Sequence, residues 1–169
     1  PEPMLAALHE ARRGADAGEV PIGAVVVKDG VVLAAAHNQP RALRDPSAHA
    51  EILAIRAAAM ALGNERLDGC ELWVSLEPCP MCAGAIVLAR VPRVVFAAPD
   101  PKAGAACGDL DGLGEPRLNH RPRVDSGRRP LPESACDTVV IETPAASATS
   151  LMPIRFPPLP RMPPPADED

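Results

Sequence analysis

Two short motifs constrain the fold of this chain more than any other feature of its sequence. The first is His49-Ala50-Glu51, and the second begins at Pro78 and reads Pro-Cys-Pro-Met-Cys, with the sulfurs on Cys79 and Cys82. Together they supply one imidazole, two thiols and one carboxylate. Each motif falls at the start of a predicted helix, so a fold that uses them as one site has to bring two helix starts together.

The residue types and their spacing predict a zinc site with one open position. Cys79 and Cys82 are three residues apart, so their sulfurs can reach one ion from a single helix turn. A helix N-terminus favours the thiolate form that binds zinc. His49 completes a Cys₂His set, which leaves a fourth position for a water whose pKa zinc lowers to about 7. Glu51 is expected to move protons between that water and a substrate, and not to bind the metal.

Each motif taken alone has a commoner interpretation. A lone C-x-x-C is more often a redox pair or half of a structural zinc site, and a lone H-x-E is usually a solvated helix face. A structural zinc would need a fourth protein ligand, so the two motifs together favour the zinc site with an open position. Residues two apart do not share a helix face. We therefore expect His49 in the first turn, with its side chain directed back to the metal and Glu51 beside the water.

The hydrophobic periodicity predicts an α/β domain. The expected helices cover residues 4–15, 48–62 (capped by Ser47) and 79–90, and the expected strands cover residues 24–28, 31–36, 72–75, 93–98 and, more weakly, 123–125. The first two strands meet at Asp29-Gly30, a strong hairpin signal. This alternation predicts a mixed sheet with helices on both faces, whose later strands are parallel.

The composition fits one domain in a reducing compartment. A length of 169 residues predicts a single domain, and a net charge of −5 argues against a protein that coats nucleic acid nonspecifically. Five cysteines, an odd number, argue against a disulfide scaffold, so we expect a cytoplasmic location. No apolar run reaches the length of a membrane span, and no leader sequence is expected.

The sequence changes character after residue 121. We expect a domain over residues 1–143, regular to about residue 121 and atypical after it, and a disordered tail over residues 144–169, where eight of 26 residues are proline. Arginine far outnumbers lysine, and Ala, Pro and Gly are abundant, which indicates a GC-rich genome. A frameshift in such a gene, after the codon of Arg121, is one hypothesis for the change of character.

The two motifs together form the signature of zinc-dependent nucleobase deaminases. Around them the chain resembles the bacterial tRNA-specific adenosine deaminases, which are members of the cytidine deaminase-like superfamily. The resemblance covers residues 19 to about 121. It rests on residues 19–25, Asn38 with residues 45–51, residues 75–85, 93–96, 100–105 and 118–121.

This resemblance implies a cytidine deaminase-like three-layer α/β/α fold with one Zn²⁺ per chain. The implied reaction is hydrolysis of adenosine to inosine at the wobble position of a tRNA anticodon loop. The implied partner is the anticodon stem-loop, which a homodimer binds with the target base flipped into a pocket. Asn38 matches the family residue that hydrogen-bonds the flipped base, and Asp100, Lys102 and Asn119 match positions that contact the nucleotides around it.

Two other functions stay open. A deaminase of the same fold that acts on a free base or nucleoside, of the guanine or cytosine type, would not need the terminal helix that the family normally uses to grip RNA. A non-catalytic zinc-binding or RNA-binding module is the second alternative, and Glu51 argues against it because a structural zinc has no use for a free carboxylate. Cys70, Cys107 and Cys136 are interpreted as small buried or incidental residues, of which only Cys107 could lie near the site, and its role stays open. The arginines at positions 117, 121, 123, 128 and 129 are either a phosphate site or a solvated loop.

Overall fold

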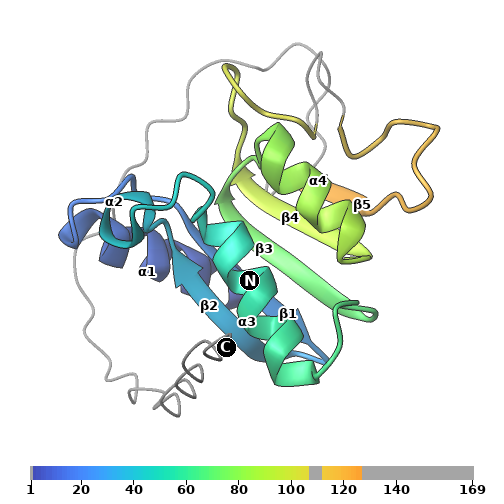
Figure 1. Cartoon of the computed structure of the whole chain (residues 1–169), viewed down its shortest axis with the longest axis horizontal. Helices are drawn as coiled ribbons and strands as arrows, with labels where there is room; N and C mark the ends of the chain where they lie inside the picture. The colour runs from blue at the N-terminus through green and yellow to red at the C-terminus, as the bar shows by residue number, and fades with distance from the viewer. Residues whose placement is uncertain (1, 107–111, 127–169) are drawn as a thin grey trace, which may run out of the picture. The chain divides into compact units, whose positions relative to one another are not determined.

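A mixed five-stranded sheet lies between helices in the computed structural model, which describes residues 2–106 and 112–126. The helices are α1 (Glu2–Asp16), α2 (Pro40–Leu43), α3 (Ala50–Leu62) and α4 (Pro80–Leu88), and the strands are β1 (Gly23–Lys28), β2 (Val31–His37), β3 (Cys70–Leu76), β4 (Arg93–Ala98) and β5 (Arg123–Ser126). The strand order is β2-β1-β3-β4-β5. Helix α1 covers one face of the sheet, and α3 and α4 cover the other (Figure 1). The three-layer α/β/α prediction is confirmed.

Side chains along β1 alternate between two hydrophobic layers, as is typical of a strand that is buried on both faces. Ala24 and Val26 belong to the layer beneath α3 and α4, whereas Val25 and Val27 pack in the layer beneath α1. Gly23 begins the strand, and a Cβ there would collide with the backbone of α1. Helix α1 therefore lies directly on the sheet.

The sheet topology places the ends of several elements at one edge. β1 pairs antiparallel with β2 and with β3, whereas β3 pairs parallel with β4 and β4 pairs parallel with β5. The prediction that the later strands are parallel is confirmed. Since β3, α4 and β4 form a crossover unit, the carboxyl end of β3 leads directly into the start of α4. Ligand sites in such sheets lie outside the carboxyl ends of the strands.

The turn of the β1–β2 hairpin and the end of α3 follow the sequence signals. Asp29 and Gly30 both have positive φ, 50° and 78°, as a two-residue hairpin turn of the primed type requires. Gly63, with φ of 63°, ends α3 in the left-handed conformation that favours glycine. These two predictions are confirmed.

The prediction that Ser47 caps the second helix is wrong. The Ser47 hydroxyl instead donates a 2.7 Å hydrogen bond to Asp45 Oδ1, and the N-cap of α3 is His49. Helix α4 likewise begins one residue later than predicted, because Cys79 is its N-cap residue. It ends at Leu88 and not at Arg90. Helix α2 lies in a segment that the sequence predicts as a loop.

Several predictions fall outside the described residues. They are the tail over residues 144–169, the frameshift hypothesis beyond Arg121 as far as it concerns residues 127–169, and the role of Cys107. Within residues 2–106 and 112–126, none of the helices is both long and apolar enough to cross a membrane.

Candidate active site

His49, Cys79 and Cys82 come together where α3 and α4 begin. His49 Nδ1 lies 3.7 Å from Cys79 Sγ and 3.6 Å from Cys82 Sγ, and the three ligand atoms lie within 4.8 Å of one another. For a tetrahedral zinc, with Zn–N of about 2.05 Å and Zn–S of about 2.3 Å, a nitrogen and a sulfur ligand stand about 3.6 Å apart. The spacing and the donor types therefore fit a metal ion of this kind.

The backbone at the two helix starts leaves these side chains available. His49 has φ −73° and ψ 154°, and Cys79 has φ −74° and ψ 170°, so both are extended N-cap residues. Neither side chain makes a capping hydrogen bond. Because His49 precedes α3 instead of lying in its first turn, His49 and Glu51 do not need to share a helix face, and the difficulty in their spacing disappears.

The side chain of Asn38, which lies outside α3, makes the capping hydrogen bond that the His49 side chain does not make. Its side chain is 3% exposed, and its Oδ1 accepts a 2.8 Å hydrogen bond from the Ala50 N–H. This bond fixes the backbone of Ala50, the residue that follows His49 and precedes Glu51. The amide N–H₂ group of Asn38 takes no part in this bond.

Glu51 is a buried carboxylate beside the metal-binding group. It is 3% exposed, and its Oε2 has no hydrogen-bond partner among the described residues. Burial raises the pKa of Glu51, and the charges of Cys79 and His49 act on this pKa in opposite directions, so the carboxylate lies close to both. A buried polar atom without a partner is costly, and such atoms gather at functional sites.

The two thiols have unequal acidities. The pKa of Cys79 is lowered to about 5, chiefly because its sulfur accepts a hydrogen bond from Cys82. The pKa of Cys82 is raised, first by the same hydrogen bond and then by burial. The hydrogen bond thus favours the thiolate form of Cys79 over that of Cys82, and a thiolate is the form that binds a metal ion.

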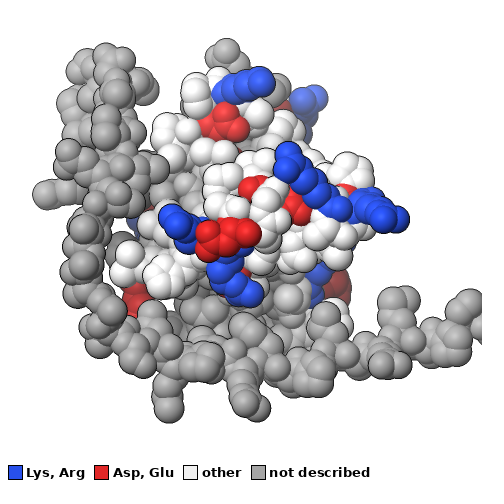
Figure 2. Space-filling view, turned by 90° about the vertical axis from the view of Figure 1, so that its left-hand side faces the viewer, with Lys and Arg blue, Asp and Glu red and all other residues white. Residues whose placement is uncertain are grey.

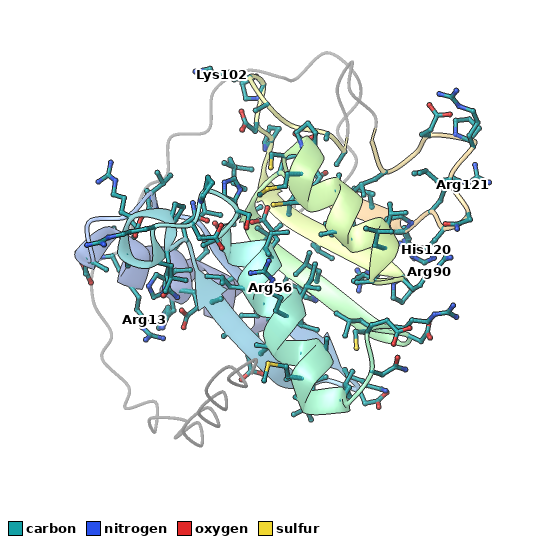
Figure 3. All side chains as sticks on the ribbon, in the orientation of Figure 1. Arg13, Arg56, Arg90, Lys102, His120 and Arg121 are labelled. Atoms are coloured by element: carbon teal, nitrogen blue, oxygen red, sulfur yellow. The ribbon has the colours of Figure 1, made fainter. Side chains whose placement is uncertain are left out.

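The structure places the other predicted substrate contacts at two different locations. Asp100 and Lys102 lie in the loop after β4, where Asp100 Oδ1 accepts hydrogen bonds from the Lys102 and Ala103 N–H groups at 3.0 and 3.2 Å. Asn119 Oδ1 instead accepts a 2.9 Å hydrogen bond from Arg90, which follows the far end of α4. Figure 3 shows Lys102 and Arg90 toward opposite ends of α4. Asn119 is therefore not brought to the metal-binding group.

Two further buried carboxylates bind backbone N–H groups of neighbouring segments. The sequence alone predicts no role for either of them. Glu19 is 7% exposed and accepts hydrogen bonds from the Arg41 and Ala42 N–H groups at the start of α2, at 3.1 and 2.9 Å from Oε1. Glu77 is 5% exposed and accepts hydrogen bonds from the Asp100 and Ala106 N–H groups of the loop after β4. Its position in the sequence could have identified Glu77, because a charged residue there lies between a buried strand and the candidate metal ligand Cys79.

Charges outside the site are mixed in sign. On the side of the molecule that carries α2, Lys and Arg side chains are interspersed with Asp and Glu side chains (Figure 2). In the predicted arginine run, Arg117 pairs with Glu115 at 2.8 Å and Arg123 pairs with Asp125 at 3.1 Å. Arg128 and Arg129 lie outside the described residues. The paired arginines favour the solvated-loop interpretation over a phosphate site.

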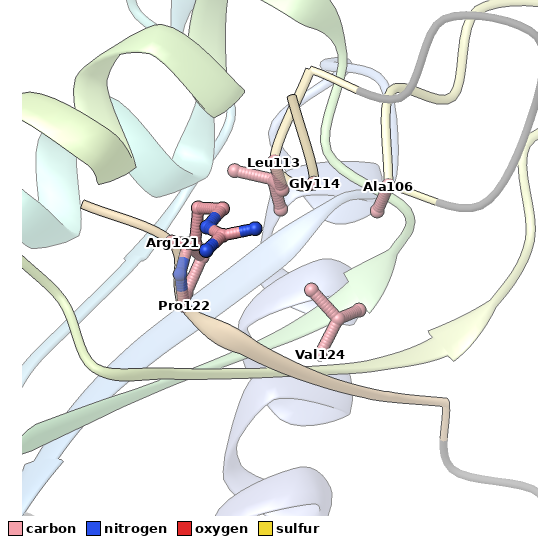
Figure 4. A pocket seen from close by; sticks show the side chains of 6 residues that line it. All are labelled: Ala106, Leu113, Gly114, Arg121, Pro122 and Val124. Atoms are coloured by element: carbon pink, nitrogen blue, oxygen red, sulfur yellow. The ribbon is translucent and has the colours of Figure 1, made fainter. Parts of the chain in front are cut away.

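A separate hollow of about 470 Å³ lies at the start of β5, against the segments that precede this strand. Its lining residues are Ala106, Leu113, Gly114, Arg121, Pro122 and Val124 (Figure 4). None of the metal-binding candidates lines it. The hollow is therefore distinct from the candidate active site.

A family model and several relatives match most of this chain. The model of the MafB19-like deaminase family matches residues 2–129. The tRNA-specific adenosine deaminase of Aquifex aeolicus (strain VF5) is 50% identical over 118 residues, which are 70% of this chain and 78% of that protein. The tRNA-specific adenosine deaminase of Bacillus subtilis (strain 168) is 51% identical over 124 residues, 73% of this chain and 77% of that protein.

Solved structures are similar as well. One, from a study of A-to-I editing by tRNA:A34 deaminases at the wobble position, has a TM-score of 0.72 and 50% identity, and covers 75% of this chain and 97% of that chain. The guanine deaminase from Bacillus subtilis has a TM-score of 0.57 and 46% identity, and covers 58% of this chain and 63% of that chain.

We expect Cys79→Ser to lose its metal, because a serine hydroxyl is a poor replacement for a thiolate ligand. Metal content per chain after dialysis is the measurement. The melting temperature should fall as well, since metal binding is coupled to folding. Cys70→Ser is the matched control: Cys70 is a buried core residue outside the group, and this variant should keep its metal. Full metal content in Cys79→Ser would contradict the assignment.

Proposed function

The chain belongs to the family of the tRNA-specific adenosine deaminases, within the MafB19-like deaminases, and we propose on this premise that it hydrolyses adenosine to inosine at the wobble position of a tRNA anticodon loop. The observation that carries the proposal is Glu51, a buried carboxylate with an unpartnered oxygen beside three metal-binding side chains. A structural metal site has no use for such a group, whereas a hydrolytic deamination requires a proton carrier.

Zn²⁺ is the proposed metal, held by His49, Cys79 and Cys82. One imidazole and two thiolates suit zinc, and three protein ligands leave a position open, as catalytic zinc sites do. Zinc bound there supplies an activated water at neutral pH. The free cysteines of the group need a reducing compartment, which supports the cytoplasm as the proposed location.

Glu51 is the proposed proton carrier. Its unpartnered Oε2 takes a proton from the attacking water and gives it to a ring nitrogen of the base. The carboxylate then takes the remaining proton of the added hydroxyl group and passes it to the amino group, which leaves as ammonia while the carbon–oxygen double bond of inosine forms. Because burial raises its pKa, Glu51 holds a proton more readily than an exposed glutamate, which suits a group that both accepts and donates.

The groups around the site support a base that is presented by RNA. Asn38 has its amide N–H₂ group available for a flipped base, and the loop with Asp100 and Lys102 offers polar contacts to neighbouring nucleotides. A loop nucleotide is already poorly stacked, which reduces the few kcal/mol that flipping requires. The likeness to a guanine deaminase favours one alternative, a deaminase of a free base on the same fold.

A homodimer is the proposed assembly, with the exposed face of α4 in the interface. Met81 and Leu88 are seven residues apart, so they lie on one face of α4, where they are 40% and 80% exposed. Met60 on the neighbouring α3 is 62% exposed. Large apolar side chains in such a group are typical of protein contacts.

Glu51→Gln is expected to keep its fold and its zinc while the turnover number falls by at least about a hundredfold, the low end of general acid–base catalysis. The amide has the same shape and cannot carry the proton. Single-turnover rates and zinc content are the measurements. Glu65→Gln makes the same change at a side chain that is 85% exposed and should leave both unchanged. Near-normal turnover of Glu51→Gln would reject the proposed role.

Substrate selectivity is tested by comparing an anticodon stem-loop that carries adenosine at the wobble position with free adenosine, cytosine and guanine. We expect kcat/KM for the stem-loop to exceed that for each free compound, because contacts outside the pocket add binding energy only for RNA. Faster turnover of guanine would favour the alternative function. Turnover of none of these by the zinc-loaded protein would favour a non-catalytic module.

Leu88→Glu should convert the proposed dimer into a monomer, because a charged side chain would be buried at the interface without a partner. Sedimentation equilibrium gives the mass directly. Leu5→Glu is the control: Leu5 is 61% exposed, but it lies on α1, on the opposite face of the sheet. A monomeric wild-type protein would refute the dimer without affecting the proposed reaction.

A further inference from the structure

Glu77 joins the segment that carries the metal ligands to the loop after β4. It follows β3 and precedes Cys79 by two residues, and its side chain is only 5% exposed. Its Oε2 accepts a 3.0 Å hydrogen bond from the Asp100 N–H, and its Oε1 accepts a 2.9 Å hydrogen bond from the Ala106 N–H. One carboxylate therefore binds both ends of the loop of residues 98–106.

Backbone bonds strengthen the same junction. The Glu77 N–H donates to the Ala98 carbonyl at 2.8 Å, and the Pro78 carbonyl accepts from the Ala105 N–H at 2.9 Å. The loop packs closely against the carboxylate at Gly104, where an added Cβ would collide with the Glu77 carboxyl group and lie 2.6 Å from the Asp100 carbonyl oxygen. In this conformation the loop therefore has no room for a side chain at position 104.

The loop carries Asp100 and Lys102, the two predicted nucleotide contacts on this side of α4. Asp100 Oδ1 accepts the Lys102 N–H, so the placement of Asp100 also sets the backbone of Lys102. The Asp100 N–H is in turn bound to Glu77. The position of both side chains relative to Cys79 therefore depends on one buried carboxylate.

We propose that Glu77 is a positioning residue that fixes the loop of residues 98–106 for binding of the RNA around the target base. This inference rests on the proposed function and specifies how the site recognises its substrate. A carboxylate is required because both of its oxygens accept a backbone N–H, whereas an amide offers one acceptor and turns an N–H₂ group toward the other donor. Glu77 does not contact the reacting atoms, so its loss affects binding more than chemistry.

The test is Glu77→Gln in the zinc-loaded full chain, assayed on the anticodon stem-loop. We expect KM to rise about tenfold, the size of one charge-assisted hydrogen bond, while kcat changes less than about twofold and zinc content is unchanged. Glu65→Gln is the control for the change of charge. An unchanged KM, or a fall in kcat at constant KM, would overturn the proposal.

Hydrogen exchange separates this inference from the proposed function. In Glu77→Gln at least one of the Asp100 and Ala106 amides should exchange about tenfold faster or more, whereas those of β1 should keep their wild-type rates. If the wild-type protein does not deaminate the stem-loop, the proposed function fails, and exchange still shows whether Glu77 holds the loop. Unchanged exchange at both amides would overturn the inference even if the wild type is active.

Gly104→Ala is a second variant, useful if Glu77→Gln loses its zinc. It disturbs the same loop from the other side, so it should raise KM in the same way. Adding it to Glu77→Gln should raise KM by less than the product of the two single effects, because both act on one loop. Gly112→Ala is the matched control, since its Cβ would meet neighbours only at 3.5 Å, an ordinary contact. A wild-type KM in Gly104→Ala would overturn the proposal.

Discussion

The convergence of two helix starts on one face of the sheet is the constraint on which the site depends. His49 precedes α3 and Cys79 precedes α4, and the three ligand atoms lie within 4.8 Å of one another only because both helices pack in the same layer. The parallel pairing of β3 with β4 directs the chain from the end of β3 into α4, at the edge where α3 begins. A change in sheet order would separate the ligands even if both motifs stayed intact.

Burial and hydrogen bonding together set the acidities of the site. Apolar surroundings raise the pKa of Glu51, while the hydrogen bond from Cys82 lowers that of Cys79. The pKa values of Glu51 and Cys79 are thus shifted in opposite directions, and perturbed values of this kind gather at functional sites.

Three buried polar side chains, Asn38, Glu19 and Glu77, shape the rim of the site in a common way. Each binds backbone N–H groups of a segment distant in sequence, at the start of α3, the start of α2 and the loop after β4. Buried N–H groups that secondary structure does not satisfy need such acceptors. These residues thus fix the start of α3, the start of α2 and the loop after β4 through hydrogen bonds to their backbone N–H groups.

The sequence by itself determined the strands, the helices other than α2, and the candidate donor set. Periodicity and turn residues predicted α1, the hairpin and β4, because local signals of this kind depend on near neighbours, and the two motifs named the candidate ligands. Only the tertiary structure decided that His49 and not Ser47 is the N-cap residue of α3, and that the Asn38 side chain accepts the hydrogen bond at this helix start. It also decided that Glu51 Oε2 is buried without a hydrogen-bond partner among the described residues, and that Asn119 lies at the far end of α4. The physical reason is that a cap, a buried orphan atom and a loop position depend on contacts between residues far apart in the chain, and no local pattern encodes them.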